Sequence, residues 1–204
     1  EVTLLQPEKI IVVCGEHLEQ ISSTIYDSGH IVEYAYQSEP LGTGHAVLCC
    51  IEQIAEVDKK VLIICGDTPL INHDMLYNFI NNDCQMIATR FDNPSGYGRV
   101  ICNESGQLVK IVEHKDCTEE ELCVNMVNSG IYCLESQSIV QHIENITNDN
   151  AQEEYYLPDL LNLIVTAGKD INIFILDKSE QNQLLGINTP EQLEVVSKLM
   201  MENL

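Results

Sequence analysis

The sequence predicts an α/β fold in which a doubly wound, mostly parallel sheet is covered by helices on both faces. Short apolar, β-branched runs alternate with stretches of helical periodicity up to residue 91. An alternating hairpin pattern then follows near the middle of the chain. The 204 residues are 45% hydrophobic and contain neither an internal repeat nor a linker-like segment, which predicts one domain over residues 1–204.

The first half of the chain predicts buried strands separated by helices. The clearest strand is "KKVLIICGD" (59–67), where an unbroken apolar run ends in Gly and Asp. Strands joined through helices pair in parallel, because the helix carries the chain back to the end of the sheet at which the first strand began. The predicted strands are 9–15, 31–36, 59–67 and 85–91, and the predicted helices are 16–27, 43–57 and 73–82.

The second half adds a hairpin and further strands and helices. Residues 98–113 contain two alternating runs joined by Asn-Glu-Ser-Gly, which predicts an inserted β-hairpin. Gly168 is placed to be the C′ residue of the helix before it. Thr189, Pro190 and Gln192 have the spacing of a capping box that starts the last helix. The remaining predicted elements are strands 127–135 and 171–177 and helices 136–146, 157–168 and 189–201.

Composition excludes several classes of protein. The formal net charge of −22 argues against a nucleic-acid partner, because the phosphate backbone would be repelled. No apolar run is long enough to span a bilayer, so no membrane association is expected. The absence of HExxH and Gly-x-Ser-x-Gly disfavours zincins and hydrolytic triads. The nine cysteines form no CxxC, which favours free thiols in a reducing cytoplasm over a disulfide scaffold or a zinc site.

Ligands of an open parallel sheet bind outside the carboxyl ends of its strands. The segments at these ends are therefore candidates for a site, and we expect them to converge on one crevice. They are Gln37 with the corner Gly42-Thr43-Gly44, the pair Gly66-Asp67, and "DNPSGYGR" (92–99).

Asp67 has two interpretations that the sequence leaves open. A carboxylate directly after a buried strand is well placed to hold Mg²⁺ together with phosphate oxygens. The same residue type is also a common N-cap, here for the helix that follows.

The corner at Gly42-Thr43-Gly44 is equally open. It is either a helix-entry turn capped by Thr43 or a side-chain-free backbone that reads a base edge or a phosphate. His45, in the first turn of the next helix, is expected to pack or cap rather than to catalyse.

Other polar residues carry weaker signals. Glu113 ends the hairpin and could accept hydrogen bonds from sugar hydroxyls, although a solvated strand-end charge is the default for a lone Glu. Asn128 and Asn188 each precede a Ser or Thr, a pattern that turns and caps also explain.

Several motifs together, in this order, resemble the uridylyltransferase domain of bacterial N-acetylglucosamine-1-phosphate uridylyltransferase. The resemblance runs from about residue 9 to the end of the chain. The motifs are "QSEPLGTGHAV", "GDTPLI", "NPSGYGRV", "IVEHKD", "NSGIY", "EEYYLPD" and "GINTPEQL".

The resemblance implies the nucleotide-diphospho-sugar transferase variant of the doubly wound sheet. It also implies that UTP and N-acetylglucosamine 1-phosphate are converted with Mg²⁺ to UDP-N-acetylglucosamine and pyrophosphate, a step of peptidoglycan and cell-wall synthesis in the cytoplasm. By motif match, Gln37, Gly42 and Thr43 would lie around the uracil, and Asp67, preceded by Gly66, would hold Mg²⁺ with Asn188. The residues implied for the N-acetylglucosamine moiety are Gly98, Glu113 and Asn128, with Tyr155 or Tyr156 close by.

The sequence departs from the family at its start. The family's first strand and its basic, glycine-rich loop, which cradles the UTP phosphates, have no counterpart here, so the domain is expected to be incomplete at the N-terminus. The acetyltransferase repeats that usually follow are also missing. The alternatives are therefore a catalytically inactive UDP-sugar-binding or interaction protein, or a nucleotidylyltransferase for another sugar 1-phosphate.

Overall fold

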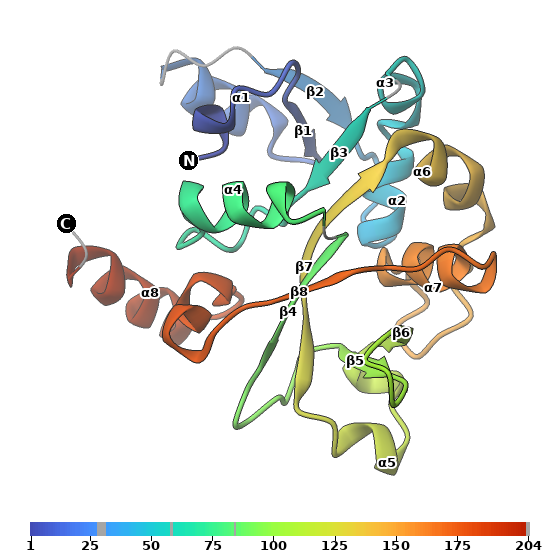
Figure 1. The fold of residues 1–204 in the computed structure, drawn as a ribbon. Coiled ribbons are helices and arrows are strands. Elements are labelled where there is room, and N and C mark those ends of the chain that lie inside the picture. Colours follow the sequence, from blue (N-terminus) through green and yellow to red (C-terminus); the bar gives the residue numbers. More distant parts are fainter. Residues whose placement is uncertain (28–31, 58, 84, 203–204) are drawn as a thin grey trace. The chain divides into compact units, whose positions relative to one another are not determined.

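The computed structural model describes residues 1–27, 32–57, 59–83 and 85–202, and the chain divides into two compact units (Figure 1). Unit 1 comprises Glu1–Leu5, Leu62–Cys133 and Ile171–Leu204, and unit 2 comprises Gln6–Val61 and Leu134–Asp170. The predicted α/β class is confirmed. That both units form a single domain stays a prediction.

The main sheet is mixed, with strands in the order β6-β5-β7-β4-β8 and β3 paired to β7. Strand β7 runs antiparallel to both β4 and β5, whereas β4 and β8 are parallel. The predicted hairpin is present as the antiparallel pair β5 and β6. The strands are β3 (Lys60–Ile63), β4 (Met86–Arg90), β5 (Arg99–Cys102), β6 (Leu108–Val112), β7 (Met126–Glu135) and β8 (Ile173–Ile175).

Helix α4 (His73–Asn81) covers this sheet in unit 1 because one of its faces is apolar. Its Leu76 and Phe79 are fully buried, and they join Ile87 of β4 and Ile131 of β7 in one core cluster. The other helical segments of the unit are η1 (Val2–Leu5), η2 (His114–Asp116), α5 (Glu119–Leu122), η4 (Lys178–Leu184) and α8 (Pro190–Glu202).

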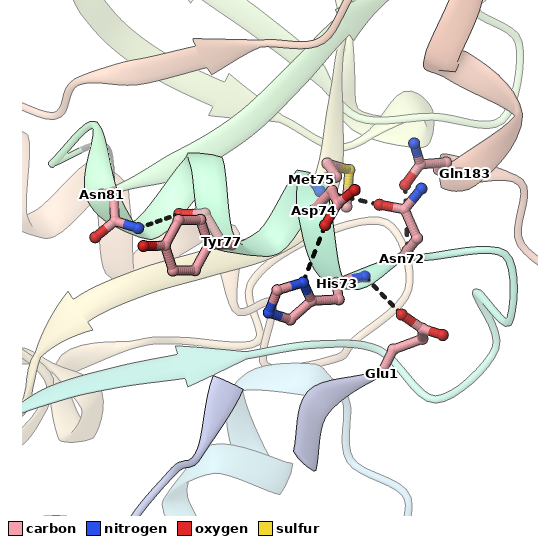
Figure 2. Close-up of polar contacts among 8 residues, drawn as sticks. All are labelled: Glu1, Asn72, His73, Asp74, Met75, Tyr77, Asn81 and Gln183. Carbon is pink, nitrogen blue, oxygen red and sulfur yellow. Dashed lines mark hydrogen bonds and ion pairs between the residues drawn. The ribbon is translucent and has the colours of Figure 1, made fainter. Parts of the chain in front are cut away.

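Side chains accept hydrogen bonds from the backbone N–H groups at the start of α4 (Figure 2). Asn72 is the N-cap, and its Oδ1 accepts from the Met75 N–H over 2.9 Å. The carboxylate of Glu1 accepts from the His73 N–H over 2.7 Å. Gln183 Oε1 accepts from the Asn72 N–H over 3.2 Å. The free N–H groups of this helix end are therefore largely satisfied within the unit.

Unit 2 contains a separate two-stranded parallel sheet, β1 (Ile11–Cys14) and β2 (Glu33–Tyr36). Ile31, which belongs to the strand predicted at 31–36, lies outside the described residues. The helical segments of the unit are α1 (Leu18–Asp27), α2 (Thr43–Leu48), α3 (Ile51–Ala55), α6 (Ser136–His142), η3 (Ile143–Asn145) and α7 (Pro158–Thr166).

The single helix predicted at 43–57 is two helices, so that prediction is wrong at its centre. At Cys50 the backbone makes a hydrogen bond to the third residue before it, not to the fourth as in an α-helix. The Cys50 N–H donates to the Val47 carbonyl over 3.1 Å. The Cys50 thiol also donates to that carbonyl, over 3.2 Å, and so competes with a regular helical hydrogen bond.

The helix ends predicted from sequence are confirmed. Gly168 has φ +84° and follows the last turn of α7. Its N–H donates to Val165 O over 2.9 Å, and the Lys169 N–H donates to Ile164 O over 3.2 Å, which together make a Schellman motif. At the start of α8, Gln192 N–H donates to Thr189 Oγ1 and Thr189 N–H donates to Gln192 Oε1.

No helix in the described part of the chain is both long enough and apolar enough to cross a membrane.

Candidate functional site

Asp67 lies exposed in a turn beyond the end of β3. It does not cap the next helix, because the N-cap of α4 is Asn72 and the chain turns again at 69–70 before that helix begins. The N-cap interpretation of Asp67 is therefore wrong, and its exposed carboxylate can bind a ligand.

The side chains of Asp67 and Asn188 face a common point beside Gly186. A Cβ built on Gly186 would lie 3.3 Å from Asp67 Oδ2 and 3.6 Å from Asn188 Nδ2. The backbone holds the two segments together, because the Ile187 N–H donates to the Asp67 carbonyl over 2.9 Å. The Asn188 N–H donates to Gln192 Oε1 over 2.6 Å at the start of α8. Two residues far apart in sequence thus meet within unit 1.

This pair suits a magnesium ion. Both side chains are exposed, and no described residue donates to the Asp67 carboxylate or bonds to the Asn188 side-chain amide. Mg²⁺ prefers carboxylate and amide oxygens and completes its shell with water and substrate phosphates. Asn188 would therefore ligate the ion through Oδ1, with its amide turned from the orientation in which Nδ2 lies nearest Gly186. In the described residues, no three His, Cys, Asp or Glu side chains gather into a site that holds a metal by protein ligands alone.

Charges near Asp67 make this region of unit 1 attractive to cations. The pKa of the Cys65 thiol is raised to about 11, first by burial and then by the negative charges of Asp67 and Glu113. Burial and the Asp67 charge also raise the pKa of the Tyr97 hydroxyl. Both groups hold their protons partly because the same carboxylate lies nearby, and a bound cation would offset that negative field.

Gly98 and Glu113 lie against each other. A Cβ on Gly98 would lie 3.1 Å from Glu113 Oε1, so glycine leaves room for the carboxylate. The Gly98 carbonyl accepts from the Asn128 N–H over 2.9 Å, which brings the third implied sugar residue to the same segment. The Asn128 side chain, 8% exposed, already donates to the Tyr132 hydroxyl and accepts from the Gly130 N–H. Asn128 lies inside strand β7, so it forms neither the turn nor the cap that the sequence pattern also allowed, and that interpretation is wrong.

Arg99 fixes the loop that carries Gly98. Its guanidinium is buried, with the residue 2% exposed, and it donates to the Tyr97 carbonyl. Its Nη2 lies 3.4 Å from His114 Nδ1, next to Glu113. The Arg99 guanidinium therefore contacts Tyr97, next to Gly98, and His114, next to Glu113, and so links the two segments.

In unit 2, Gly42 is required by close packing. It is the N-cap of α2 with φ +113°, and a Cβ there would lie 2.6 Å from the Tyr155 carbonyl oxygen. That carbonyl accepts from the Gly44 N–H over 2.7 Å. Thr43 is not the cap that its position allowed, since Gly42 takes that place. The Thr43 Oγ1 instead accepts from the Leu157 N–H over 3.0 Å.

Gln37 lies beside the same corner. Its Nε2 donates to the Gly42 carbonyl over 3.1 Å and lies 3.0 Å from His45 Nδ1. Tyr155 is half-buried, with its ring centroid 6.3 Å from that of His45, and Tyr156 is buried.

The residues implied by the resemblance therefore fall into two groups, and their convergence on one crevice stays a prediction. Gly66 is exposed, and a Cβ there would meet nothing within 4 Å. Unit 1 holds Gly66, Asp67, Gly98, Glu113, Asn128 and Asn188, and unit 2 holds Gln37, Gly42, Thr43, Tyr155 and Tyr156.

The sequence gave no role to Arg99 and did not predict the contact between His45 and Gln37. A lone basic residue and a lone histidine have no local signature, because their partners are set by tertiary contacts. The short helix α5 was also missed, although Thr118 and Glu121 have capping-box spacing and do form that motif.

Known proteins resemble this chain over most of its length. The family model of nucleotidyl transferases matches residues 2–180. The chain is 40% identical over 199 residues to the bifunctional protein GlmU of Caldanaerobacter subterraneus, covering 95% of this chain and 42% of that protein. It is 34% identical to the GlmU of a Geobacillus strain, covering all of this chain and 45% of that protein. The chain thus spans less than half the length of these bacterial relatives.

A relative of more similar length is a probable UDP-N-acetylglucosamine pyrophosphorylase of Acanthamoeba polyphaga mimivirus. It is 36% identical over 208 residues, which cover 98% of this chain and 82% of that protein. Because the family model covers most of the chain and this relative is covered over most of its length, the chain belongs to the nucleotidyl transferase family.

Proposed function

We propose that this chain transfers a uridylyl group from UTP to N-acetylglucosamine 1-phosphate, giving UDP-N-acetylglucosamine and pyrophosphate. The observation that carries the proposal is the meeting of Asp67 and Asn188 beside Gly186, with both side chains exposed. The name of the mimivirus relative, a probable UDP-N-acetylglucosamine pyrophosphorylase, supports uridine as the nucleoside and N-acetylglucosamine as the sugar.

The reaction asks for positioning and charge neutralisation rather than covalent catalysis. The phosphate oxygen of the sugar phosphate attacks the α-phosphorus of UTP, and pyrophosphate leaves. The attacking phosphate is already ionised near neutral pH, so no side chain has to remove a proton. Mg²⁺ held by Asp67 and Asn188 would offset the repulsion between the reacting phosphates.

The protein's own cations contribute little to phosphate binding. At least five lysines in the described part of the chain form ion pairs with carboxylates, and the formal net charge is −22. Nucleotide binding to this chain should therefore depend strongly on Mg²⁺ and weaken when the metal is chelated. The paired lysines are Lys9, Lys59, Lys110, Lys178 and Lys198.

Gly98 and Glu113 are proposed to bind the sugar. The Glu113 carboxylate accepts well from sugar hydroxyls, and the missing side chain at Gly98 leaves space beside it. We place the activity in the reducing cytoplasm, where the eight described cysteines would stay the free thiols that they are in the structure.

The test is an assay of pyrophosphate release from UTP and N-acetylglucosamine 1-phosphate with MgCl₂, using the longest protein that the gene encodes. We expect turnover that EDTA abolishes and that Asp67→Asn lowers on the order of 100-fold. The proposal is wrong if the protein neither releases pyrophosphate nor makes UDP-N-acetylglucosamine. Parallel reactions with glucose 1-phosphate and galactose 1-phosphate decide whether another sugar is preferred.

A second candidate function is binding of UDP-sugar without turnover. It is favoured by the same scarcity of unpaired basic side chains, because triphosphate activation needs more positive charge than product binding does. Calorimetry that detects UDP-N-acetylglucosamine binding, combined with no product in the assay above, would establish it.

A further inference from the structure

The side chain of Gln37 is held by two acceptors in unit 2. Its Nε2 lies 3.1 Å from the Gly42 carbonyl oxygen and 3.0 Å from His45 Nδ1. Its backbone is also fixed, because the Gln37 N–H donates to the Cys14 carbonyl of β1 over 2.9 Å. These contacts come from two segments, β1 and the start of α2, so the position of Gln37 is set by the packing of α2 beside the strands of unit 2.

These contacts decide which way round the amide lies. A carbonyl oxygen accepts and cannot donate, so the atom facing Gly42 O must be the NH₂ group. The second N–H of that group then points to His45, and Nδ1 must accept it. The imidazole proton therefore sits on Nε2, which lies 4.0 Å from the Cys49 sulfur.

This orientation leaves the Gln37 oxygen as the outward-facing atom. No described residue donates to Gln37 Oε1, and the residue is only partly buried. A fixed acceptor with no donor from the described residues selects a ligand edge that carries a donor. Among pyrimidines, uracil has an N–H at N3, whereas N3 of cytosine is an acceptor and would face the oxygen unfavourably.

We propose that His45 is a specificity-determining positioning residue, which holds the Gln37 amide with its oxygen outward and thereby makes the site prefer uracil over cytosine. This inference rests on the proposed function, since it takes Gln37 to face the nucleobase. Without Nδ1, only Gly42 O would hold the NH₂ group. The amide could then turn its NH₂ outward, where it would donate to cytosine N3.

The choice of substitutions separates positioning from packing. His45→Phe keeps a flat ring next to Tyr155 but removes the acceptor, whereas His45→Asn places an amide oxygen close to the position of Nδ1. His142→Phe makes the same chemical change at the end of α6, in the same unit and outside the proposed site.

The measurement is calorimetric binding of UDP and of CDP, both with MgCl₂. We expect the ratio of their dissociation constants to favour UDP in the unmodified protein. His45→Phe should lower that preference about three- to tenfold, the effect of losing one hydrogen bond. His45→Asn should retain most of the preference, and His142→Phe should leave it unchanged. An unchanged ratio in His45→Phe overturns the inference.

The outcomes also distinguish this inference from the proposed function. If the protein makes or binds UDP-N-acetylglucosamine but binds UDP and CDP equally, the function stands and the role of His45 fails. If it binds neither nucleotide, both fail.

A ligand-free readout adds a second test. Long-range ¹H–¹⁵N spectra at about pH 8, where an ordinary imidazole is neutral, should place the His45 proton on Nε2. A proton on Nδ1 would overturn the inference, because Nδ1–H cannot accept from Gln37.

Discussion

Asp67 and Asn188, one beyond the end of β3 and the other at the start of α8, both lie within 4 Å of the Cβ position of Gly186. The two residues are far apart in the sequence. The connection is made by one backbone hydrogen bond, from Ile187 N–H to Asp67 O. The candidate metal site is thus created by the meeting of two loops and would be lost if either loop moved.

Replacing either member of this pair should weaken magnesium-dependent turnover without unfolding the protein. Asp67→Asn removes the only charged ligand of the pair, and Asn188→Ala removes the neutral one, so the first should have the larger effect on kcat. Both side chains are exposed, and the thermal midpoint should change little. Asp74→Asn, at an exposed carboxylate on α4, is the control. Equal turnover in Asp67→Asn and the unmodified protein would contradict the metal assignment.

Gly42→Ala should destabilise the protein by at least about 1–3 kcal/mol, because the new Cβ meets the Tyr155 backbone and φ is +113°. Gly168→Ala is the matched comparison, since Gly168 has φ +84° and open space around its Cβ position. Urea unfolding of both variants should therefore show the larger loss for Gly42→Ala. Equal losses would mean that backbone strain alone, and not Tyr155, makes glycine necessary.

Gly98→Ala should separate binding from stability. The added methyl group would lie 3.1 Å from Glu113 Oε1, the end of a flexible side chain that can move away. We expect a small change in unfolding free energy, about 0.5 kcal/mol or less, together with weaker binding of UDP-N-acetylglucosamine. Glu113→Gln, which keeps the shape but removes the charge, should weaken binding in the same direction. If Gly98→Ala and Glu113→Gln both bind normally, these two residues are not part of the sugar site.

Arg99→Lys should cost about 1–3 kcal/mol of stability. An ammonium group cannot reach both the Tyr97 carbonyl and His114 Nδ1 as the guanidinium fork does, and the site is buried. Arg90→Lys, in which the exposed Arg90 donates to Asn125 Oδ1, is the control and should change stability by about 0.5 kcal/mol or less. Similar losses for the two variants would refute a special role for Arg99.

Stability should fall as the pH rises from about 9 to about 11. The pKa values of Cys50 and Cys65 are raised to about 11 in the folded protein, mainly by burial, from an ordinary value of 9.0. The unfolded chain therefore releases these protons first, and the difference in bound protons favours unfolding in that window. Cys65→Ser should reduce the slope of unfolding free energy against pH. Measurement of the same variant at pH 7 separates the packing change from the titration, and an unchanged slope would count against the burial of this thiol.

The sequence by itself determined the order of elements and most of their ends. Apolar runs and helical spacing located the strands and main helices, because burial imposes periodicity on each segment separately. Gly168 and the Thr189–Gln192 box fixed helix ends in the same local way. Asp67 and Asn188 became candidates only through the resemblance and their positions after strands or before helices.

Only the tertiary structure decided which local options were used. In the structure Asn72, and not Asp67, caps α4. Gly42 packs against the Tyr155 backbone. The Gln37 amide lies between the Gly42 carbonyl and His45. The tertiary structure also placed β7 antiparallel to β4 and β5, within a sheet that was expected to be mostly parallel. These outcomes depend on contacts between segments distant in sequence, and no local pattern encodes which distant backbone group will occupy a given space.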